Sequence, residues 1–343
     1  MEGEKELTYK IGILDQSPIF PGQTAGEALK STMELAQKAE EWGYERFWVS
    51  EHHQTLDLAG ASPEVLISHL LAKTTSIKVG SGGVMLQHYS PYKVTEDFQL
   101  LSLLSPGRVE LGIGKAPGGL SLSTQALSYG GAGSDIDFDE RFRALHHFIH
   151  DTLPEDHELY GAKPLPKPEE EVPVFLLGAS STSAKLAAEQ RANFVYAHFL
   201  NSNNDFLREA VVTYREIYPA GKFIVAIASF AAETQGMAEQ EARNYKIYKI
   251  FTESGRSISV QTLEQVEAFR EQSEESMKEV KEQEVEMIAG SPAFIKEELD
   301  KLASAFQIGD FIIHTPILDR EKRLKSFELL SQLTVPVLNK QLR

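Results

Sequence analysis

Short apolar runs alternate with amphipathic stretches along most of this 343-residue sequence. Continuous apolar runs are typical of buried strands, and an apolar period of about 3.6 residues is typical of helices. Strands and helices that alternate in this way predict repeated βα units and a parallel sheet. The apolar runs predict eight strands, over residues 9–14, 45–50, 77–86, 109–113, 172–177, 194–198, 223–229 and 311–314.

Helix-start signals lie between these strands. Thr24 is followed three residues later by Glu27, which is a capping-box pattern, and Ser62-Pro63 places a capping residue before a proline. No G-x-G-x-x-G motif follows the first strand, so an open dinucleotide-binding sheet is disfavoured. We therefore predict an α/β protein that forms a single (β/α)8 TIM barrel domain over residues 1–343.

Two segments do not fit the repeat. The connection over residues 115–135 is rich in Gly and Ser, which predicts a long loop over one end of the barrel. Between Leu263 and Glu286 there are nine Glu against three Lys or Arg, which predicts a solvated helix or a mobile excursion. We expect an insertion over residues 255–290, and the family resemblance described below implies that this insertion is lid-like.

Composition excludes several classes of function. The chain has no cysteine, so a disulfide framework, a thiolate metal site and a cysteine nucleophile are ruled out. A formal net charge of -16 disfavours nucleic acid and acidic membrane surfaces as partners. The sequence shows neither a secretion signal nor an apolar stretch long enough to span a bilayer, so we expect a cytoplasmic protein.

Glu51, His52 and His53 directly follow the second predicted strand. Active-site residues of such barrels lie at the carboxyl ends of strands, so these three are the strongest catalytic candidates. Side chains alternate along a strand, so Glu51 and His53 should share one face. An imidazole there can act as a general acid or base that Glu51 orients. The alternatives are a simple strand cap, or a metal site for which later strands supply few ligands.

Gly82 and Gly83 interrupt the third predicted strand. Paired glycines weaken a strand unless the backbone must approach a ligand or adopt an unusual geometry. A flat ring can stack at such a place, and a β-bulge is the alternative interpretation.

A run of small and hydroxyl-bearing residues lies between the fifth strand and an alanine-rich helix. Free N–H groups at a helix N-terminus, with hydroxyls beside them, favour an anionic phosphate. Ordinary capping by Ser181 or Thr182 explains one hydroxyl but not the whole run. Lys115, after the fourth strand, can supply positive charge. The run is Gly178, Ala179, Ser180, Ser181, Thr182 and Ser183.

His146 and His150 lie one turn apart on a predicted helix, a spacing that can hold a metal. No catalytic Glu lies between them and the helix lies outside the barrel, so a surface face is favoured. We predict no metal site.

Together these motifs resemble the bacterial luciferase-like flavin-dependent monooxygenases, and in particular the luciferase α-subunit. The likeness covers almost the whole chain and is densest from Gly43 to Gly114. It includes the segments GYERFWVSEHH, IKVGSGGVML, HYSPYKVTEDFQLLSLLSPGRVELGIGK and, later, VPVFLLGASSTSAKLAAEQ.

The resemblance implies an FMN-dependent monooxygenase. Such an enzyme uses reduced FMN (FMNH2) and O2 to oxygenate a small organic substrate, receives FMNH2 from a separate flavin reductase, and forms a homodimer. A deazaflavin-dependent hydride-transfer oxidoreductase and a non-catalytic flavin-binding protein are the alternatives on the same fold.

The resemblance also implies roles for single residues. His52 corresponds to the catalytic histidine, with Glu51 and His53 as its neighbours. A non-proline cis peptide is expected at Gly82-Gly83, beneath the flavin. The residues expected at the cofactor are Gly82, Gly83, Lys115, Arg143 (or alternatively Arg141), Gly178, Ala179, Ser180, Ser181, Thr182 and His198.

Four positions depart from the family pattern. Gly114 stands where the family has a reactive cysteine, Ala179 where it has a phosphate-binding serine, and His198 where luciferase has a tryptophan. Lys115 replaces an arginine, which keeps the charge but loses the planar fork. Light emission is therefore not expected.

Overall fold

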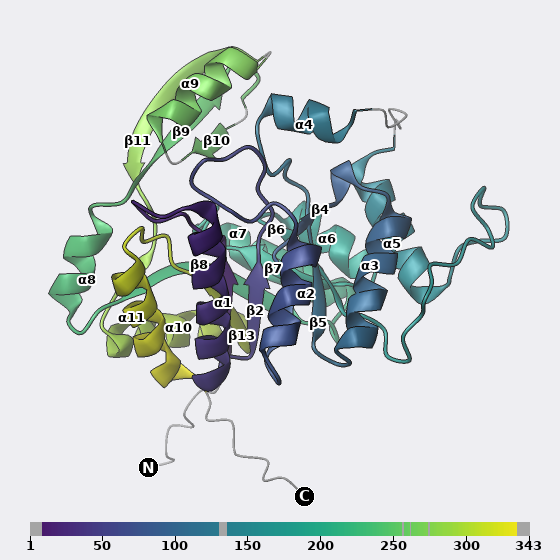
Figure 1. The fold of residues 1–343 in the computed structure, drawn as a ribbon, viewed down its shortest axis with the longest axis horizontal. Coiled ribbons are helices and arrows are strands. Elements are labelled where there is room, and N and C mark those ends of the chain that lie inside the picture. The colour runs from purple at the N-terminus through teal and green to yellow at the C-terminus, as the bar shows by residue number, and fades with distance from the viewer. Residues whose placement is uncertain (1–8, 130–135, 256, 261, 274, 335–343) are drawn as a thin grey trace, which may run out of the picture.

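The computed structural model describes residues 9–129 and 136–334, with the exception of residues 256, 261 and 274. In this part of the chain, parallel strands close into a barrel and helices surround it (Figure 1). The last barrel strand pairs with the first, with Ile11 opposite Phe311. The predicted (β/α)8 fold is confirmed.

Each of the eight predicted strands overlaps a strand of the barrel. Each of the eight barrel strands is hydrogen-bonded to a neighbour on both sides, so the barrel is closed. In order around the barrel the strands are β1 (Lys10–Asp15), β2 (Arg46–Val49), β3 (Lys78–Ser81), β5 (Val109–Gly114), β6 (Val174–Gly178), β7 (Asn193–Ala197), β8 (Phe223–Ala231) and β13 (Asp310–His314).

The third predicted strand is divided in the structure. β3 ends at Ser81, and β4 (Val84–Met85) resumes the pairing with β5 after a cis peptide between Gly82 and Gly83. A Cβ atom on Gly83 would lie 2.8 Å from backbone atoms of β5. The prediction of one continuous strand to residue 86 was wrong, because the backbone turns tightly against β5 at the glycines.

Helices cover the outside of the barrel. The capping box of Thr24 and Glu27 forms at the start of the first helix. Ser62 precedes its proline without making a side-chain cap bond. The helices are α1 (Ala25–Glu41), α2 (Pro63–Lys73), α3 (Pro91–Leu104), α5 (Phe138–His150), α6 (Ser181–Glu189), α7 (Asn204–Ile217), α10 (Pro292–Phe306) and α11 (Arg320–Leu330), with short 3-10 turns η1 (Leu86–His88) and η2 (Ser331–Leu333).

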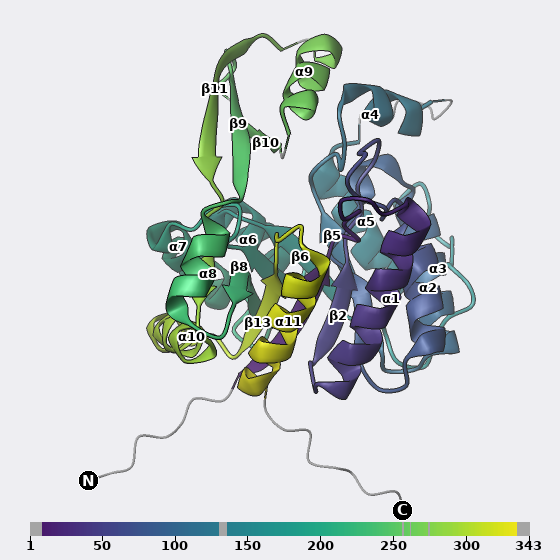
Figure 2. The ribbon, with the colours of Figure 1, turned by 60° about the vertical axis from the view of Figure 1, so that its left-hand side comes forward.

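Two insertions rise from the end of the barrel where the strands terminate (Figure 2). The segment predicted as a long loop contains α4 (Ser121–Leu127), and its residues 130–135 lie outside the described residues. The second insertion follows β8. Its elements are α8 (Gln235–Ala242), β9 (Lys246–Thr252), β10 (Ser257–Val260), α9 (Leu263–Gln272) and β11 (Met277–Glu284), after which β12 (Ile288–Gly290) returns to β8.

The acidic stretch is more ordered than we predicted. Its helix α9 is followed by strand β11, which pairs with β9 in an antiparallel sheet that begins at Lys246, before residue 255. Val266 and Phe269 of α9 pack into a small apolar core of this insertion. The sequence hid β11 because its exposed side chains are Lys and Glu, and Lys246 pairs with Glu282 across the sheet.

The insertion contacts the barrel end through specific side chains. Gln265 donates a hydrogen bond of 3.2 Å from Nε2 to Asp57, in the loop after β2. Leu120, beside α4, packs against the small core of the insertion. Both contacts place the insertion over the ends of the strands. Within the described residues, no helix is long and apolar enough to cross a membrane.

A buried cluster of charges lies near the strand starts inside the barrel. Arg46 of β2 donates from Nε to Glu110 Oε2 at 3.0 Å and also pairs with Asp310 of β13. Trp48 donates from Nε1 to the same Glu110 oxygen at 2.7 Å. Burial opposes the charge of Arg46, but Glu110 and Asp310 raise its pKa, so the guanidinium stays ionised.

We expect Arg46→Met to lower the free energy of unfolding by about 3 to 5 kcal/mol, because two carboxylates would lose their buried cation. The control is Lys93→Ala, which removes an exposed pair with Asp97 on α3 and should cost less than about 1 kcal/mol. Urea denaturation measures both changes. Equal losses in the two variants would contradict the assigned role of Arg46.

Candidate active site

Glu51 is the centre of a buried hydrogen-bond network at the carboxyl end of β2. Its Oε1 accepts from the Tyr89 hydroxyl at 2.7 Å and lies 2.7 Å from Nε2 of His53. Its Oε2 accepts the backbone N–H of Met85 at 3.0 Å. The side chain is fully buried, and three donors satisfy it. The network therefore joins the end of β2 to β4 and to the segment before α3.

The contact between Glu51 and His53 confirms that the two residues share a face. Burial, and then the hydrogen bond to Glu51, raise the pKa of Tyr89, so its hydroxyl stays protonated and donates. His53 is also held by its backbone N–H, which donates to the Gly118 carbonyl at 2.8 Å. Gly118 has a φ of +68°, and a Cβ there would lie 3.2 Å from the Glu51 carbonyl oxygen. Position 118 therefore requires glycine, because its backbone passes close to Glu51.

His52 makes a separate set of contacts. Its Nδ1 lies 3.0 Å from Oγ of Ser50, and its backbone N–H donates to Gly60. Burial, and then the charge of His53, lower the pKa of His52 to about 4, so its ring is neutral at neutral pH. Nε2 of His52 has no hydrogen-bond partner among the described residues.

The Gly82-Gly83 peptide has the cis geometry that the resemblance implied. A Cβ on Gly82 would lie 2.6 Å from Leu14 Cδ1 and 3.3 Å from Trp48 Cε3. The packing of the barrel interior therefore accounts for this glycine without a ligand. A flat ring above it stays a proposal.

Gly114 explains one departure from the family pattern. A Cβ at this position would lie 2.9 Å from Cε and 3.2 Å from Sδ of Met85. The Met85 side chain thus occupies the space that a cysteine side chain at position 114 would need.

A small cavity lies where β5 and β6 end beside α6. Ser180, and not Ser181 or Thr182, is the N-cap of α6, because its Oγ accepts the N–H of Ser183 at 3.2 Å. A Cβ on Gly178 would lie 2.5 Å from Cβ of Ser183, so only glycine lets the helix start this close to β6. The lining residues are Lys115, Phe138, Asp139, Leu176, Leu177, Thr182, Ser183 and Leu186.

The polar groups of this cavity fit a phosphate. Thr182 and Ser183 present hydroxyls at the N-terminus of α6, where backbone N–H groups favour an anion. Lys115 supplies a cation and pairs with Asp139 at 3.1 Å, so a phosphate would share this lysine with a carboxylate. Ser181 is instead engaged with Glu209 at 2.8 Å.

The remaining predicted cofactor residues lie at several places around this end. Arg143 is exposed on α5 and does not line the cavity, whereas Arg141 donates to the Tyr89 carbonyl at 3.2 Å. Ala179 lies in the turn between β6 and α6. His198 follows β7 and lies 3.3 Å from Asn204 Oδ1, and burial lowers its pKa.

The histidines on α5 lie close together. The ring centroids of His146 and His150 are 4.1 Å apart, and His150 lies 2.7 Å from Glu171. In the described ranges of the chain, no group of three or more acidic or histidine side chains is placed to hold a metal.

Sequence analysis missed several polar residues of this region. Tyr89 lies 38 residues from Glu51 in the chain, and no spacing rule connects the two. Ser183 is the last hydroxyl of the run that we identified. His314 ends the eighth predicted strand, so the rule that identified Glu51 also points to it. Arg323, which lies near His314, carries no such signal because it is on a helix.

Several known proteins are similar to this chain. A family model described as luciferase-like monooxygenase matches residues 9–307. N-acetyl-S-alkylcysteine monooxygenase of Bacillus subtilis (strain 168) is 43% identical over 325 residues, which cover 94% of this chain and 97% of the relative.

Two solved structures are also similar. The crystal structure of apo-MsnO8 matches with a TM-score of 0.74 and 30% identity, and covers 95% of this chain and 97% of its own. The oxygenating constituent of 3,6-diketocamphane monooxygenase from Pseudomonas putida, in complex with FMN, matches with a TM-score of 0.69 and 17% identity. That match covers 96% of this chain and 99% of the other, and it shows likeness of fold.

Burial gives the stability of the fold a defined pH dependence. It is the main cause that lowers the pKa of His52 and His146 to about 4 and that of His314 to about 3. Histidine in an unfolded chain titrates near about 6.5, so the unfolded state binds protons first as the pH falls. The contribution of these neutral rings is complete above about pH 6.5 and is lost as the pH falls toward their folded values.

We therefore expect the free energy of unfolding to fall between about pH 6.5 and pH 4.5, and His52→Gln to make this fall less steep by removing one of the groups. Urea denaturation at several pH values checks both. An identical pH slope in the variant and the original chain would count against the lowered pKa of His52.

Proposed function

Because this chain belongs to the luciferase-like monooxygenase family, we propose that it uses reduced FMN and O2 to oxygenate a small organic substrate. The observation that carries the proposal is the placement of two features at one end of the barrel. The phosphate-fitting cavity beside α6 and the cluster of Glu51, His52 and His53 both lie where the strands terminate. A flavin phosphate in the cavity would direct the ring toward the strand ends.

Bound reduced FMN would supply two electrons, so that one oxygen atom of O2 enters the substrate and the other leaves as water. Lys115, Thr182 and Ser183 would hold the phosphate, together with the N–H groups that begin α6. The glycines at 82 and 83 would let the ring lie against the backbone, and His198 would border the ring. The Glu51 network would keep β4 and His53 in fixed positions under it.

His52 would be the catalytic residue. Its ring is neutral and oriented by Ser50, and Nε2 has no partner among the described residues, so it can donate or accept a hydrogen bond there. At this atom it would hold or transfer the proton that accompanies oxygen transfer. Glu51 would be a positioning residue, because its hydrogen bonds hold the side chains of His53 and Tyr89 in place.

The Bacillus subtilis relative suggests a class of substrate. Its name describes an acetylated cysteine that carries an alkyl group on sulfur. We propose a substrate of the same kind for this chain, a small carboxylic acid with a thioether.

Partners and domain organisation are part of the proposal. A separate flavin reductase would supply reduced FMN, since the first strand carries no dinucleotide motif. Exposed apolar side chains on α2 and α3, among them Val65, Leu100 and Leu104, support a homodimer through these helices. The chain would form one barrel domain, with the insertion of α9 and β9 to β11 covering the site.

Replacing His52 by Ala should lower the rate of substrate oxygenation by about a hundredfold or more, because the proton-transfer group is lost. His157→Ala, in the loop between α5 and β6, is the matched control and should keep the original rate. Oxygen uptake is measured with chemically reduced FMN and N-acetyl-S-methylcysteine. Turnover only with a reduced deazaflavin would favour the hydride-transfer alternative, and flavin binding without turnover would favour a non-catalytic protein.

Replacing Lys115 by Ala should weaken the binding of reduced FMN by about tenfold or more and leave riboflavin, which has no phosphate, unaffected. Lys185→Ala is the control, because Lys185 is an exposed residue of the same helix α6 and pairs with Glu189. Anaerobic absorbance titration gives both dissociation constants. If the substitution weakened the binding of both flavins equally, the phosphate would not bind in this cavity.

A further inference from the structure

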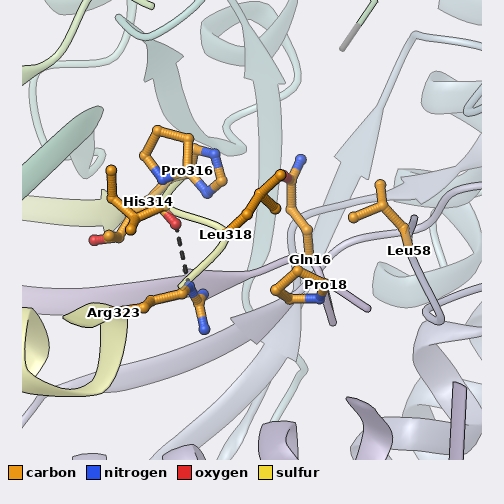
Figure 3. Close-up of a pocket in the computed structure, with 9 residues that line it drawn as sticks. Gln16, Pro18, Leu58, His314, Pro316, Leu318 and Arg323 are labelled. Carbon is orange, nitrogen blue, oxygen red and sulfur yellow. Dashed lines mark hydrogen bonds between the residues drawn. The ribbon is translucent and has the colours of Figure 1, made fainter. Parts of the chain in front are cut away.

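A second cavity opens at the carboxyl ends of β1 and β13. It is small, which suits one end of a small substrate better than a whole flavin. Figure 3 shows His314 and Pro316 on one side, Gln16 and Leu58 on the other, and Arg323 below. The lining residues are Gln16, Pro18, Leu58, His314, Thr315, Pro316, Ile317, Leu318 and Arg323. We call it the Arg323 cavity.

The Arg323 cavity lies next to the proposed catalytic residue. β1 pairs with β13 on one side and with β2 on the other. His314 ends β13 and His52 follows β2, so both residues come from strands that flank β1. The charge of His52 is one of the influences on His314. A molecule in this cavity would therefore lie at the same end of the barrel as the reacting atoms.

Arg323 is a fixed, buried cation with unused donors. Its Nη2 donates to Asp15 Oδ1 at 2.7 Å and its Nε donates to the Thr315 carbonyl at 3.1 Å. The other Asp15 oxygen accepts from Thr32 at 2.6 Å, so both oxygens of this carboxylate are engaged. A guanidinium has five N–H groups, and the described residues take up the one on Nε and one on Nη2. Nη1 and the second N–H of Nη2 make no hydrogen bond with the described residues.

His314 lies beside this cation with an unused nitrogen of its own. Its Nδ1 is buried and has no hydrogen-bond partner in the described part of the chain. Its ring lies 5.8 Å from that of Phe199, which fixes one side of it. Burial, and then the charge of Arg323, lower the pKa of His314 to about 3, so the ring is a neutral group in a positive field. The backbone of Leu14 acts on this ring in the opposite sense and raises its pKa. The buried Nδ1 still lacks a hydrogen-bond partner, which is costly unless a ligand completes it.

The combination selects a class of ligand. The free edge of a guanidinium matches the two oxygens of a carboxylate, and this geometry is specific to arginine. The neighbouring imidazole can donate one further hydrogen bond. The walls contributed by Pro18, Leu58 and Leu318 are apolar, so the part of the ligand that contacts them should be apolar.

We propose that the Arg323 cavity binds the carboxylate of the substrate, held by the Nη1 and Nη2 edge of Arg323 and by the ring of His314. The ligand is the acid that the proposed function oxygenates, and the assignment of the cavity rests on that function. The two residues would fix the acid at one end, so that its thioether extends toward His52. They act in recognition and set specificity.

The test compares N-acetyl-S-methylcysteine with its primary amide, which has the same shape without the negative charge. We expect the original chain to bind the acid at least about tenfold more tightly than the amide, and Arg323→Lys and His314→Leu each to reduce this preference by about tenfold. Arg323→Lys keeps a cation beside Asp15 but loses the fork, and His314→Leu leaves Arg323 untouched if the first variant does not fold. Arg320→Lys, on the exposed side of the same helix, is the control and should keep the preference.

Titration calorimetry without flavin measures the binding, and oxygen uptake with reduced FMN is recorded separately. A preference for the acid that depends on Arg323 and His314, without any flavin turnover, would support the cavity and reject the proposed function. Turnover with an acid preference that is unchanged in both variants would support the function and overturn the cavity. Failure of the original chain to bind the acid would also overturn it.

Discussion

Closure of the parallel sheet is the constraint on which the rest of this structure depends. β13 pairs with β1, so each of the eight barrel strands has a hydrogen-bonded neighbour on both sides and the barrel is closed. Parallel strands that close in this way bring all their carboxyl ends to one face. The polar residues that end β2, β6 and β13 therefore surround a single mouth, although they are far apart in the chain.

Buried charge is arranged differently at the two ends of the barrel. Near the strand starts, Arg46 lies between Glu110 and Asp310, and each group is satisfied by protein. At the mouth, Glu51 is satisfied as well, but His52 and His314 each keep a nitrogen without a partner among the described residues. Partnered charge stabilises and orients the framework, whereas groups that lack a partner are those that a ligand can complete.

The sequence predicted the barrel well because its signals are local. A buried strand is a short apolar run, and each of the eight runs became a barrel strand. The prediction of strands from apolar runs failed where a strand has few apolar side chains. β11 is a strand rich in Lys and Glu in a small antiparallel sheet, and its charges resemble those of a solvated helix. The segment of α4 likewise has too few apolar residues to be distinguished from a loop.

The candidate site was likewise predicted in part from the sequence and in part only from the tertiary structure. By itself the sequence determined the fold, the position of Glu51, His52 and His53 at a strand end, and the hydroxyl run before α6, since these follow from periodicity and from order along the chain. Only the tertiary structure decided that Tyr89 donates to Glu51, that Ser180 caps α6, and that Arg323 lies beside His314. These contacts join segments through packing and hydrogen-bond geometry, and no local pattern in a single sequence encodes the distance between two segments that meet only after the barrel has closed.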